Sequence, residues 1–327
     1  MNALLSHIKN LYNLKLSYLE KVKKGSLTQN HILTTDDTKY FLKQYIFDNR
    51  SKIEEIHMIK KYFVDGGIPI VLPITNVEGN TFFFYENRYY ALFPFVSDKQ
   101  LETGSMNDTA TISLGEMLGK IHLLGRDAKL PIKDKFNPWN KEKSLKKIES
   151  INKELNKIIE PTDFDLSAIE SIKLKKQLIE ENTLTYKDLN LSNDHLIHGD
   201  YLDHNVFFGD DNKVSYVFDL EKASYSPRMR ELFRSMIYSF LSEDFTKESI
   251  NKAKLYLQSY LKVYPVSKDE LSKGLKLYYL QAIHSLWTER EHYLNNNLRA
   301  DEHLKKDIMR VKYLSQNYDE FENELLK

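Results

Sequence analysis

The sequence predicts an α+β protein with two lobes: a small lobe built on an antiparallel sheet and a larger, mainly helical lobe. Between residues 16 and 93, short β-rich runs alternate with turn residues. Beyond residue 108 the pattern changes to long amphipathic helices. A chain of 327 residues can hold two such parts, each with its own core.

The small lobe is expected to begin with an amphipathic helix over residues 2–14. Strands are predicted at 16–22, 29–34 and 40–45, because β-rich runs there are separated by turn residues such as Gly25-Ser26 and Asp36-Asp37. A helix is predicted over 49–64, ending at Gly66-Gly67 ahead of Pro69. Runs at 71–77, 81–85 and 89–93 are further candidates for a sheet of five antiparallel strands.

The large lobe is expected to start near residue 96, so that the lobes comprise residues 1–95 and 96–327. A helix over 109–126 carries a broad apolar stripe, and the segment of about 131–193 is a helical insertion rich in Lys, Glu, Ile and Asn. The remaining predicted helices cover residues 141–159, 167–183, 268–296 and 301–325.

Composition and charge exclude several classes of protein. Lys plus Arg and Asp plus Glu both number 47, so the net charge is zero and nucleic acid is not an expected partner. No run is long enough to span a membrane, and the first residues lack a signal peptide, so we expect a cytoplasmic protein. The absence of cysteine excludes disulfides and thiolate chemistry. We expect a monomer or a homodimer.

The most informative stretch runs from residue 198 to residue 221. Two apolar runs on either side of the turn at 209–212 predict a β-hairpin. A hairpin brings its outer ends together, and these ends carry Asp200 and Asn205 on one side and Asp219 on the other. Three oxygen-bearing side chains of this kind suit Mg²⁺, a hard cation that is bound by a few protein oxygens together with phosphate oxygens.

Two other interpretations of this stretch are less well supported. Three histidines alternate with three aspartates, at positions 195, 198 and 204 and at 194, 200 and 203, which could indicate a zinc cluster. No predicted helix places the three histidines on one face, and this disfavours zinc. A structural hairpin with solvated turn acids would be the default for any one of these residues, but it does not account for the whole ordered set.

The same spacing is what phosphoryl transfer by kinases requires: a base in a loop, a metal-binding Asn five residues later, and a metal-binding Asp beyond the hairpin. The chain here resembles the aminoglycoside phosphotransferase and choline kinase superfamily, with its His-Gly-Asp, four residues, Asn, and Asp-x-Glu/Asp after a strand. A protein kinase would have Arg at the place of Gly199 and Phe-Gly at the place of Leu220-Glu221. Leu118-Gly119-Lys120-Ile121-His122 also resembles a segment of this superfamily, and Glu231 stands where many relatives have Asp.

The resemblance implies a kinase-like fold and a set of roles. Asp200 would be the catalytic base, supported by His198, and Asn205 and Asp219 would hold Mg²⁺. The nucleotide, ATP or GTP, would meet Lys43 on the third strand, with Glu55 or alternatively Glu54 as its partner. The remaining nucleotide contacts implied are Ser26 in the first turn and Phe93 and Phe95 in the link between the lobes.

The implied function is phosphorylation of a hydroxyl group on a small molecule such as an aminoglycoside, choline, homoserine or a sugar. A cationic acceptor would need an acidic or aromatic pocket, for which the candidates are Glu221, Tyr225, Trp287 and Glu291. His122 is expected to be a core residue rather than a catalyst. The alternatives are a non-catalytic scaffold like some spore-coat relatives and, less in keeping with the sequence, a protein Ser/Thr kinase.

Overall fold

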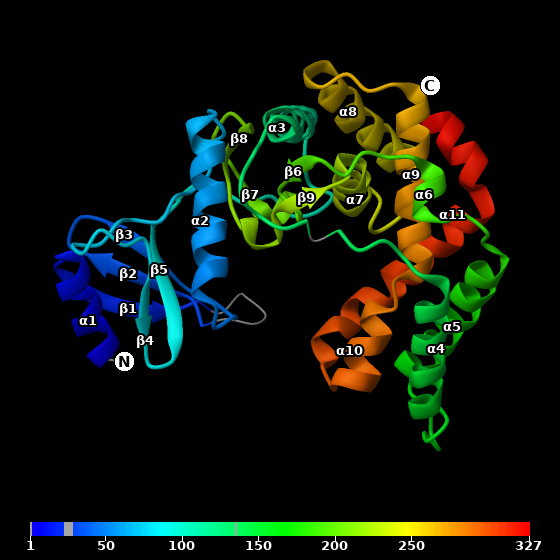
Figure 1. The fold of residues 1–327 in the computed structure, drawn as a ribbon, viewed down its shortest axis with the longest axis horizontal. Helices are drawn as coiled ribbons and strands as arrows, with labels where there is room; N and C mark the ends of the chain where they lie inside the picture. Colours follow the sequence, from blue (N-terminus) through cyan, green and yellow to red (C-terminus); the bar gives the residue numbers. More distant parts are fainter. Residues whose placement is uncertain (1, 23–28, 135) are drawn as a thin grey trace. The chain divides into compact units, whose positions relative to one another are not determined.

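The structure is a computed structural model that describes residues 2–22, 29–134 and 136–327. It comprises two compact units, which are described separately (Figure 1). Unit 1 consists of Met1–Leu101 and His204–Ala223, and unit 2 of Glu102–Asp203 and Ser224–Lys327. The predicted α+β class, with a small antiparallel sheet and a larger helical part, is confirmed. Because the 204–223 segment packs with the N-terminal residues, each unit consists of two separate segments of the chain. The predicted lobes, 1–95 and 96–327, are continuous segments, and they stay a prediction.

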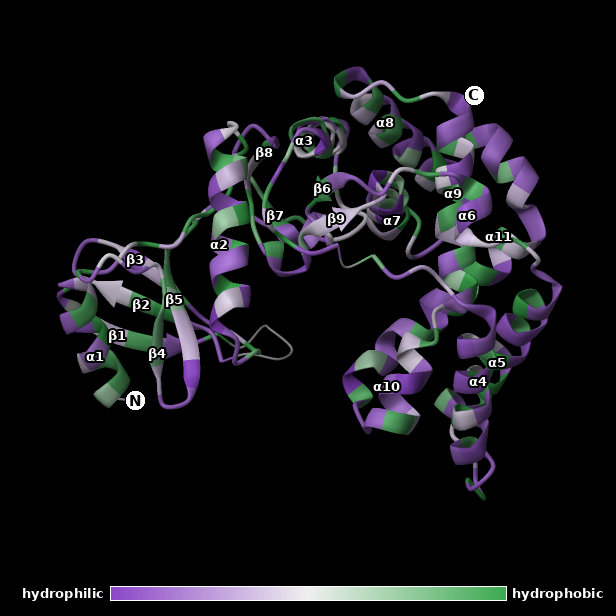
Figure 2. Ribbon diagram, viewed as in Figure 1, coloured by the Kyte–Doolittle hydropathy of each residue, from purple (hydrophilic) through white to green (hydrophobic). Residues whose placement is uncertain are grey.

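The core of unit 1 is a five-stranded antiparallel sheet with the strand order β1-β2-β3-β5-β4. Its elements are α1 (Asn2–Tyr12), β1 (Leu16–Lys21), β2 (His31–Thr35), β3 (Lys39–Gln44), α2 (Arg50–Asp65), β4 (Phe83–Tyr85), β5 (Arg88–Pro94), η1 (Asp203–Asn205), β7 (Val206–Phe208), β8 (Val214–Val217) and η2 (Leu220–Lys222). Hydrophobic and hydrophilic residues form alternating bands along α2 (Figure 2).

The two helices cover opposite faces of this sheet, because successive side chains of a strand point to opposite sides. Leu42 and Leu92 pack in the cluster that contains α1, whereas Ala91 and Phe93 pack in the cluster that contains Ile53 of α2. Lys43 follows Leu42 and pairs in register with Ala91, so it lies on the α2 face. The sheet therefore fixes on which side this lysine can act.

The predicted strand at 71–77 is wrong, because this segment is irregular, and the isolated bridge of Ile70 with Val217 lies just before it. Pro69 and Pro73 lack the backbone N–H that a ladder needs. The segment instead lies along the β7–β8 hairpin: Val217 donates its N–H to the Pro69 carbonyl at 2.8 Å, and Val71 donates to the Val217 carbonyl at 3.2 Å. These bonds attach the hairpin to unit 1.

Unit 2 is mainly helical, and its core packs helices against one another. Its elements are α3 (Asp108–Arg126), α4 (Lys141–Leu155), α5 (Asp163–Glu181), α6 (Tyr186–Leu189), β6 (His195–Ile197), β9 (Ser224–Ser226), α7 (Arg228–Phe240), α8 (Lys247–Val263), α9 (Lys268–His284), α10 (Trp287–Asn295), η3 (Leu298–His303) and α11 (Leu304–Leu325). Apolar residues of α4 and α5 share one cluster with residues of α9. No helix in the described part of the chain is both long and apolar enough to cross a membrane.

Several helix ends differ from the prediction for local reasons. The helix predicted to begin at residue 167 begins at Asp163, where Thr162 and Asp165 form a reciprocal capping box. The single helix predicted over 268–296 is wrong: it breaks after His284 into α9 and α10. The buried Lys175 donates to the Ser285 carbonyl at 2.7 Å, which satisfies a backbone group at the break.

Close backbone packing of α3 on α8 predicts a site that does not tolerate a methyl group. A Cβ added at Gly115 would lie 2.4 Å from the Tyr256 carbonyl oxygen, which is backbone and cannot turn aside. We expect Gly115→Ala to lower the free energy of unfolding by about 1–3 kcal/mol, although Gly→Ala inside a helix otherwise stabilises. Chemical denaturation measures the change, with Lys120→Ala on the exposed face of α3 as the control. Equal stability of both variants would contradict the packing described.

Candidate active site

Lys43 lies between two carboxylates within unit 1. Its Nζ is 2.9 Å from Oδ1 of Asp219 and 2.6 Å from Oε1 of Glu221, and only 17% of its side chain is exposed. Burial opposes the charged form of the lysine, but the two carboxylates outweigh it and raise the pKa of Lys43. The side chain is therefore a fixed cation tied to the end of the hairpin.

The predicted glutamate partner of Lys43 remains a prediction. Glu55 is partly exposed on α2, and the carboxylates paired with Lys43 among the described residues are Asp219 and Glu221. Glu54 pairs instead with Arg50 at 2.9 Å on the exposed face of the helix. Glu221, expected as a substrate contact, is thus a partner of the lysine, which the family pattern did not indicate.

Asn205 and Asp219 stand at the open end of the β7–β8 hairpin. The Phe218 N–H donates to the Asn205 carbonyl at 3.1 Å, so the two metal-ligand candidates flank the last bond of the ladder. Asp219 adopts a left-handed backbone, with φ 63° and ψ 55°, which costs a non-glycine residue about 1–2 kcal/mol. An amide oxygen and a carboxylate so placed are donors that a hard divalent cation accepts.

A second lysine lies on the same face of the sheet. Lys60 of α2 is 4% exposed, and its Nζ is 4.4 Å from the centre of the Phe93 ring. Burial, followed by the charge of Lys43, lowers the pKa of Lys60 to about 7. Nearby, the Tyr45 hydroxyl bonds His57 Nε2 at 2.7 Å. Sequence reasoning placed Lys60 only on the apolar stripe of the helix.

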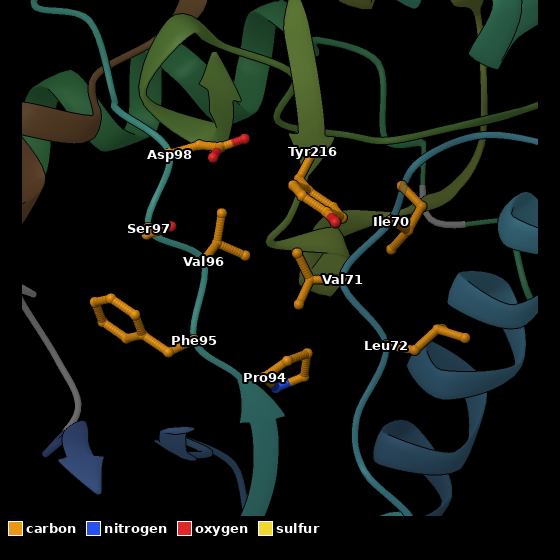
Figure 3. A pocket seen from close by; sticks show the side chains of 9 residues that line it. All are labelled: Ile70, Val71, Leu72, Pro94, Phe95, Val96, Ser97, Asp98 and Tyr216. Carbon is orange, nitrogen blue, oxygen red and sulfur yellow. The ribbon is translucent and has the colours of Figure 1, made fainter. Parts of the chain in front are cut away.

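A cavity of about 350 Å³ opens beside the predicted nucleotide link (Figure 3). In the figure the side chains of Val71, Val96 and Tyr216 point toward one another. Phe95 also lines the cavity, whereas Phe93, predicted beside it, is 4% exposed and packs in the sheet core. Val96, Ser97 and Asp98 line the cavity, and within the described residues they form no backbone–backbone hydrogen bond.

The His-Gly-Asp loop belongs to unit 2 and follows strand β6. Gly199 has a φ of 85°, which a glycine adopts without strain, and it turns the chain between His198 and Asp200. The Asp200 N–H donates to Nδ1 of His198 at 3.2 Å, and His198 is fully buried. The buried imidazole thus accepts a hydrogen bond from the backbone of the loop, and its supporting role in catalysis stays a prediction.

Glu231 of α7 anchors this loop. Its carboxylate accepts the N–H of His198 at 3.0 Å and that of Tyr201 at 3.3 Å, and it lies 3.0 Å from Nε2 of His122. Burial opposes the charge, but the hydrogen bond from His122 and the other donors lower the pKa of Glu231. A glutamate, at the position where many relatives have Asp, therefore holds this loop. His122 is fully buried here, as a core residue.

Asp200 itself pairs with an arginine. Nη1 of Arg234 lies 2.6 Å from Oδ1 of Asp200, and 13% of the aspartate side chain is exposed. Arg234 lies four residues beyond Arg230 on α7, and no pattern in the sequence predicts its contact with Asp200. The pair restricts the orientation of the carboxylate, and its role as a base stays a prediction.

The remaining predicted residues are spread over several elements. Ser26 lies outside the described residues. The Tyr225 hydroxyl bonds the backbone at Ala128 and Leu130, and Glu291 pairs with Arg290 at 2.6 Å. Trp287, at the start of α10, is 45% exposed, with its ring 5.7 Å from that of His303. Their proposed contact with substrate stays a prediction.

Comparisons with solved structures show which fold the chain adopts. A spectinomycin phosphotransferase, solved with ADP and spectinomycin, has a TM-score of 0.69 at 16% identity, over 96% of this chain and 98% of that one. An amicoumacin kinase solved with AMP-PNP and Ca²⁺ has a TM-score of 0.63 at 14% identity, over 99% and 92%. The choline kinase of Cryptosporidium parvum Iowa II gives 0.63 at 11% identity, over 99% and 98%. These likenesses confirm the predicted kinase-like fold.

The family follows from the sequence itself. Residues 19–266, more than half of the chain, match the phosphotransferase enzyme family. The chain belongs to this family, and it is an ATP-dependent kinase with an alcohol group as its acceptor. No curated protein matches the chain significantly.

Three buried histidines predict that the protein loses stability in acid. Burial is the main cause that lowers the pKa of His57 to about 3 and those of His195 and His284 to about 4. The unfolded chain, with histidine pKa values of about 6.5, takes up these protons first. The contribution of these histidines to the free energy of unfolding is therefore fully present above about pH 6.5. It falls toward pH 4, by up to about 1.4 kcal/mol per pH unit for each group.

Chemical denaturation between pH 7.5 and 5 measures this slope. We expect His284→Gln to make it shallower, whereas His303→Gln, whose side chain is 49% exposed, should keep the slope of the unmodified protein. Constant stability across this range would contradict neutral burial of these histidines.

Proposed function

We propose that this enzyme transfers the γ-phosphoryl group of MgATP to a hydroxyl of a small molecule. The observation that carries the proposal is the Lys43 cation held by Asp219 and Glu221 at the end of a hairpin that also presents Asn205. It is supported by membership of the phosphotransferase enzyme family. We also propose that the reaction takes place in the cytoplasm, where ATP is available; GTP is the alternative donor.

The nucleotide would be held by unit 1. The apolar cavity beside residues 94–98 suits a purine ring, and the unpaired backbone groups of 96–98 suit its hydrogen-bonding edge. Lys43 would neutralise phosphate charge, while Asn205 and Asp219 would hold Mg²⁺. When bound, the metal supplies charge neutralisation for the phosphate oxygens.

Asp200 would accept the proton of the attacking hydroxyl. The acceptor oxygen forms a bond to the γ-phosphorus, the bond from that phosphorus to the bridging oxygen breaks, and ADP leaves with the bridging oxygen. His198 and Glu231 hold the loop, and Arg234 orients the carboxylate. Aminoglycosides, choline, homoserine and sugars are the acceptor classes proposed from the sequence, and Tyr225, Trp287 and Glu291 remain candidate contacts.

Substitution of the base tests the mechanism. We expect Asp200→Asn to retain the fold and the binding of MgATP, and to lower kcat by about 10²–10⁴, because the amide cannot take the hydroxyl proton. ADP release with a responsive acceptor measures the effect. Asp211→Asn, which removes an exposed carboxylate from the hairpin turn, serves as the matched control. Turnover by Asp200→Asn at the level of that control would exclude the assignment.

Nucleotide binding is tested separately by thermal stability. A ligand that binds only the native state stabilises it by RT ln(1 + [L]/Kd), or about 2.7 kcal/mol at 100 Kd. We expect MgATP to raise Tm, and Lys43→Ala to lose most of the increase; parallel runs with GTP compare the two donors. A protein whose Tm ignores millimolar MgATP would instead fit the scaffold alternative.

A further inference from the structure

One face of α7, a helix labelled in Figure 1, carries two arginines and a tyrosine, and one of these arginines pairs with the predicted base. Arg230, Arg234 and Tyr238 are spaced four residues apart, so they share one side of the helix. All three are partly exposed, whereas Met229, Leu232, Phe233, Met236 and Ile237 are buried. The row is therefore the solvent-reaching side of α7, and it includes the arginine that pairs with Asp200.

Two of the arginines near this row already have carboxylate partners. Arg234 pairs with Asp200 at 2.6 Å, and Arg310 of α11 pairs with Asp307. The guanidinium carbons of Arg234 and Arg310 also lie 4.9 and 4.3 Å from the centre of the Tyr238 ring. Each cation is thus fixed by a carboxylate and an aromatic face.

Arg230 differs from its neighbours. Among the described residues, no carboxylate or carbonyl forms an ion pair or hydrogen bond with its side chain. Burial, followed by the charge of Arg234, lowers the pKa of Arg230, and the charges of Glu231 and Asp200 oppose this shift without cancelling it. The nearest acid in sequence, Glu231, directs its carboxylate to His122 and to the N–H groups of the loop.

The acids that could attract a cationic acceptor are also occupied. Glu221 is 2.6 Å from Lys43, and Glu291 is 2.6 Å from Arg290. Within unit 2, a positively charged acceptor beside Asp200 would meet the cations Arg230 and Arg234. An anionic group would instead find a planar guanidinium that offers paired donors.

Resting on the proposed phosphotransfer, we propose that Arg230 binds an anionic group of the acceptor. The acceptor is then an alcohol that also bears a carboxylate or a phosphate group. Its hydroxyl lies at Asp200 while its anion meets the Arg230 guanidinium. In this arrangement Arg234 keeps its pair with Asp200, and Arg230 determines which alcohols are accepted.

Four small alcohols that differ in charge test this specificity: glycerate, glycerol 3-phosphate, glycerol and 3-amino-1,2-propanediol. We expect one or both anions to exceed glycerol in kcat/KM by roughly 10–100-fold, the range for a hydrogen bond to a charged partner, and the amine to be poorest. Comparison of the two anions tells carboxylate from phosphate. Arg230→Gln should remove the preference, mainly through KM, while Arg88→Gln, at the exposed β4–β5 turn, should retain it.

A contact between Arg230 and the nucleotide predicts a different result. Arg230→Gln would then lower kcat/KM for all four alcohols by one factor, and this outcome would overturn the proposal. An equal preference for glycerol and the anions in the unmodified protein would overturn it as well.

A binding measurement keeps the test independent of turnover. At constant ionic strength, glycerate should raise Tm more than its neutral amide, glyceramide, in the unmodified protein and in Arg88→Gln, but not in Arg230→Gln; glycerol 3-phosphate against glycerol gives the second pair. No difference within either pair, or a difference that survives Arg230→Gln, overturns the proposal. If MgATP raises Tm and ADP is released, but the enzyme does not prefer anionic acceptors, phosphotransfer stands and this inference fails. If anions bind but MgATP does not, phosphotransfer fails instead.

Discussion

The ion pairs of Lys43 with Asp219 and Glu221 are the constraint on which the organisation of unit 1 depends. They join the third strand of the sheet to a hairpin that lies some 175 residues further along the chain. All three side chains are partly buried, so each needs its partners: removing one leaves a charge whose loss of water is no longer compensated. The same contacts therefore stabilise the end of the hairpin and hold the cation that is proposed to meet the nucleotide.

Unit 2 solves a related problem with a single carboxylate. Glu231 holds two backbone N–H groups of the His-Gly-Asp loop and the ring of His122, so one helix residue sets the position of the loop. The next turn of the same helix presents Arg234 to Asp200. Helix α7 thus supports the loop from its buried side and orients the base from its exposed side.

Sequence reasoning predicted the parts of this structure that depend on local pattern. The broad apolar stripe of residues 109–126 was enough to predict a helix there. The observed helix begins one residue earlier, where Asn107 caps it. The strand expected at 71–77 does not form, because Pro73 interrupts this β-rich run and Pro69 precedes it. The break after His284 has neither glycine nor proline to indicate it. Contacts between distant segments were harder to predict. Nothing in the sequence near Glu221 indicates Lys43, and nothing near Arg234 indicates Asp200, since each pair forms only when the chain folds.

The hairpin of residues 204–223 packs with the first hundred residues although it is encoded after a hundred residues of the other unit. Unit 1 is therefore discontinuous in the gene. A fragment that stops at Leu101 would leave Lys43 without either carboxylate, and it would expose the backbone groups of Pro69, Val71 and Lys99 that the hairpin satisfies. To produce this unit as an independent piece, genetic dissection would have to splice the hairpin onto it or permute the termini.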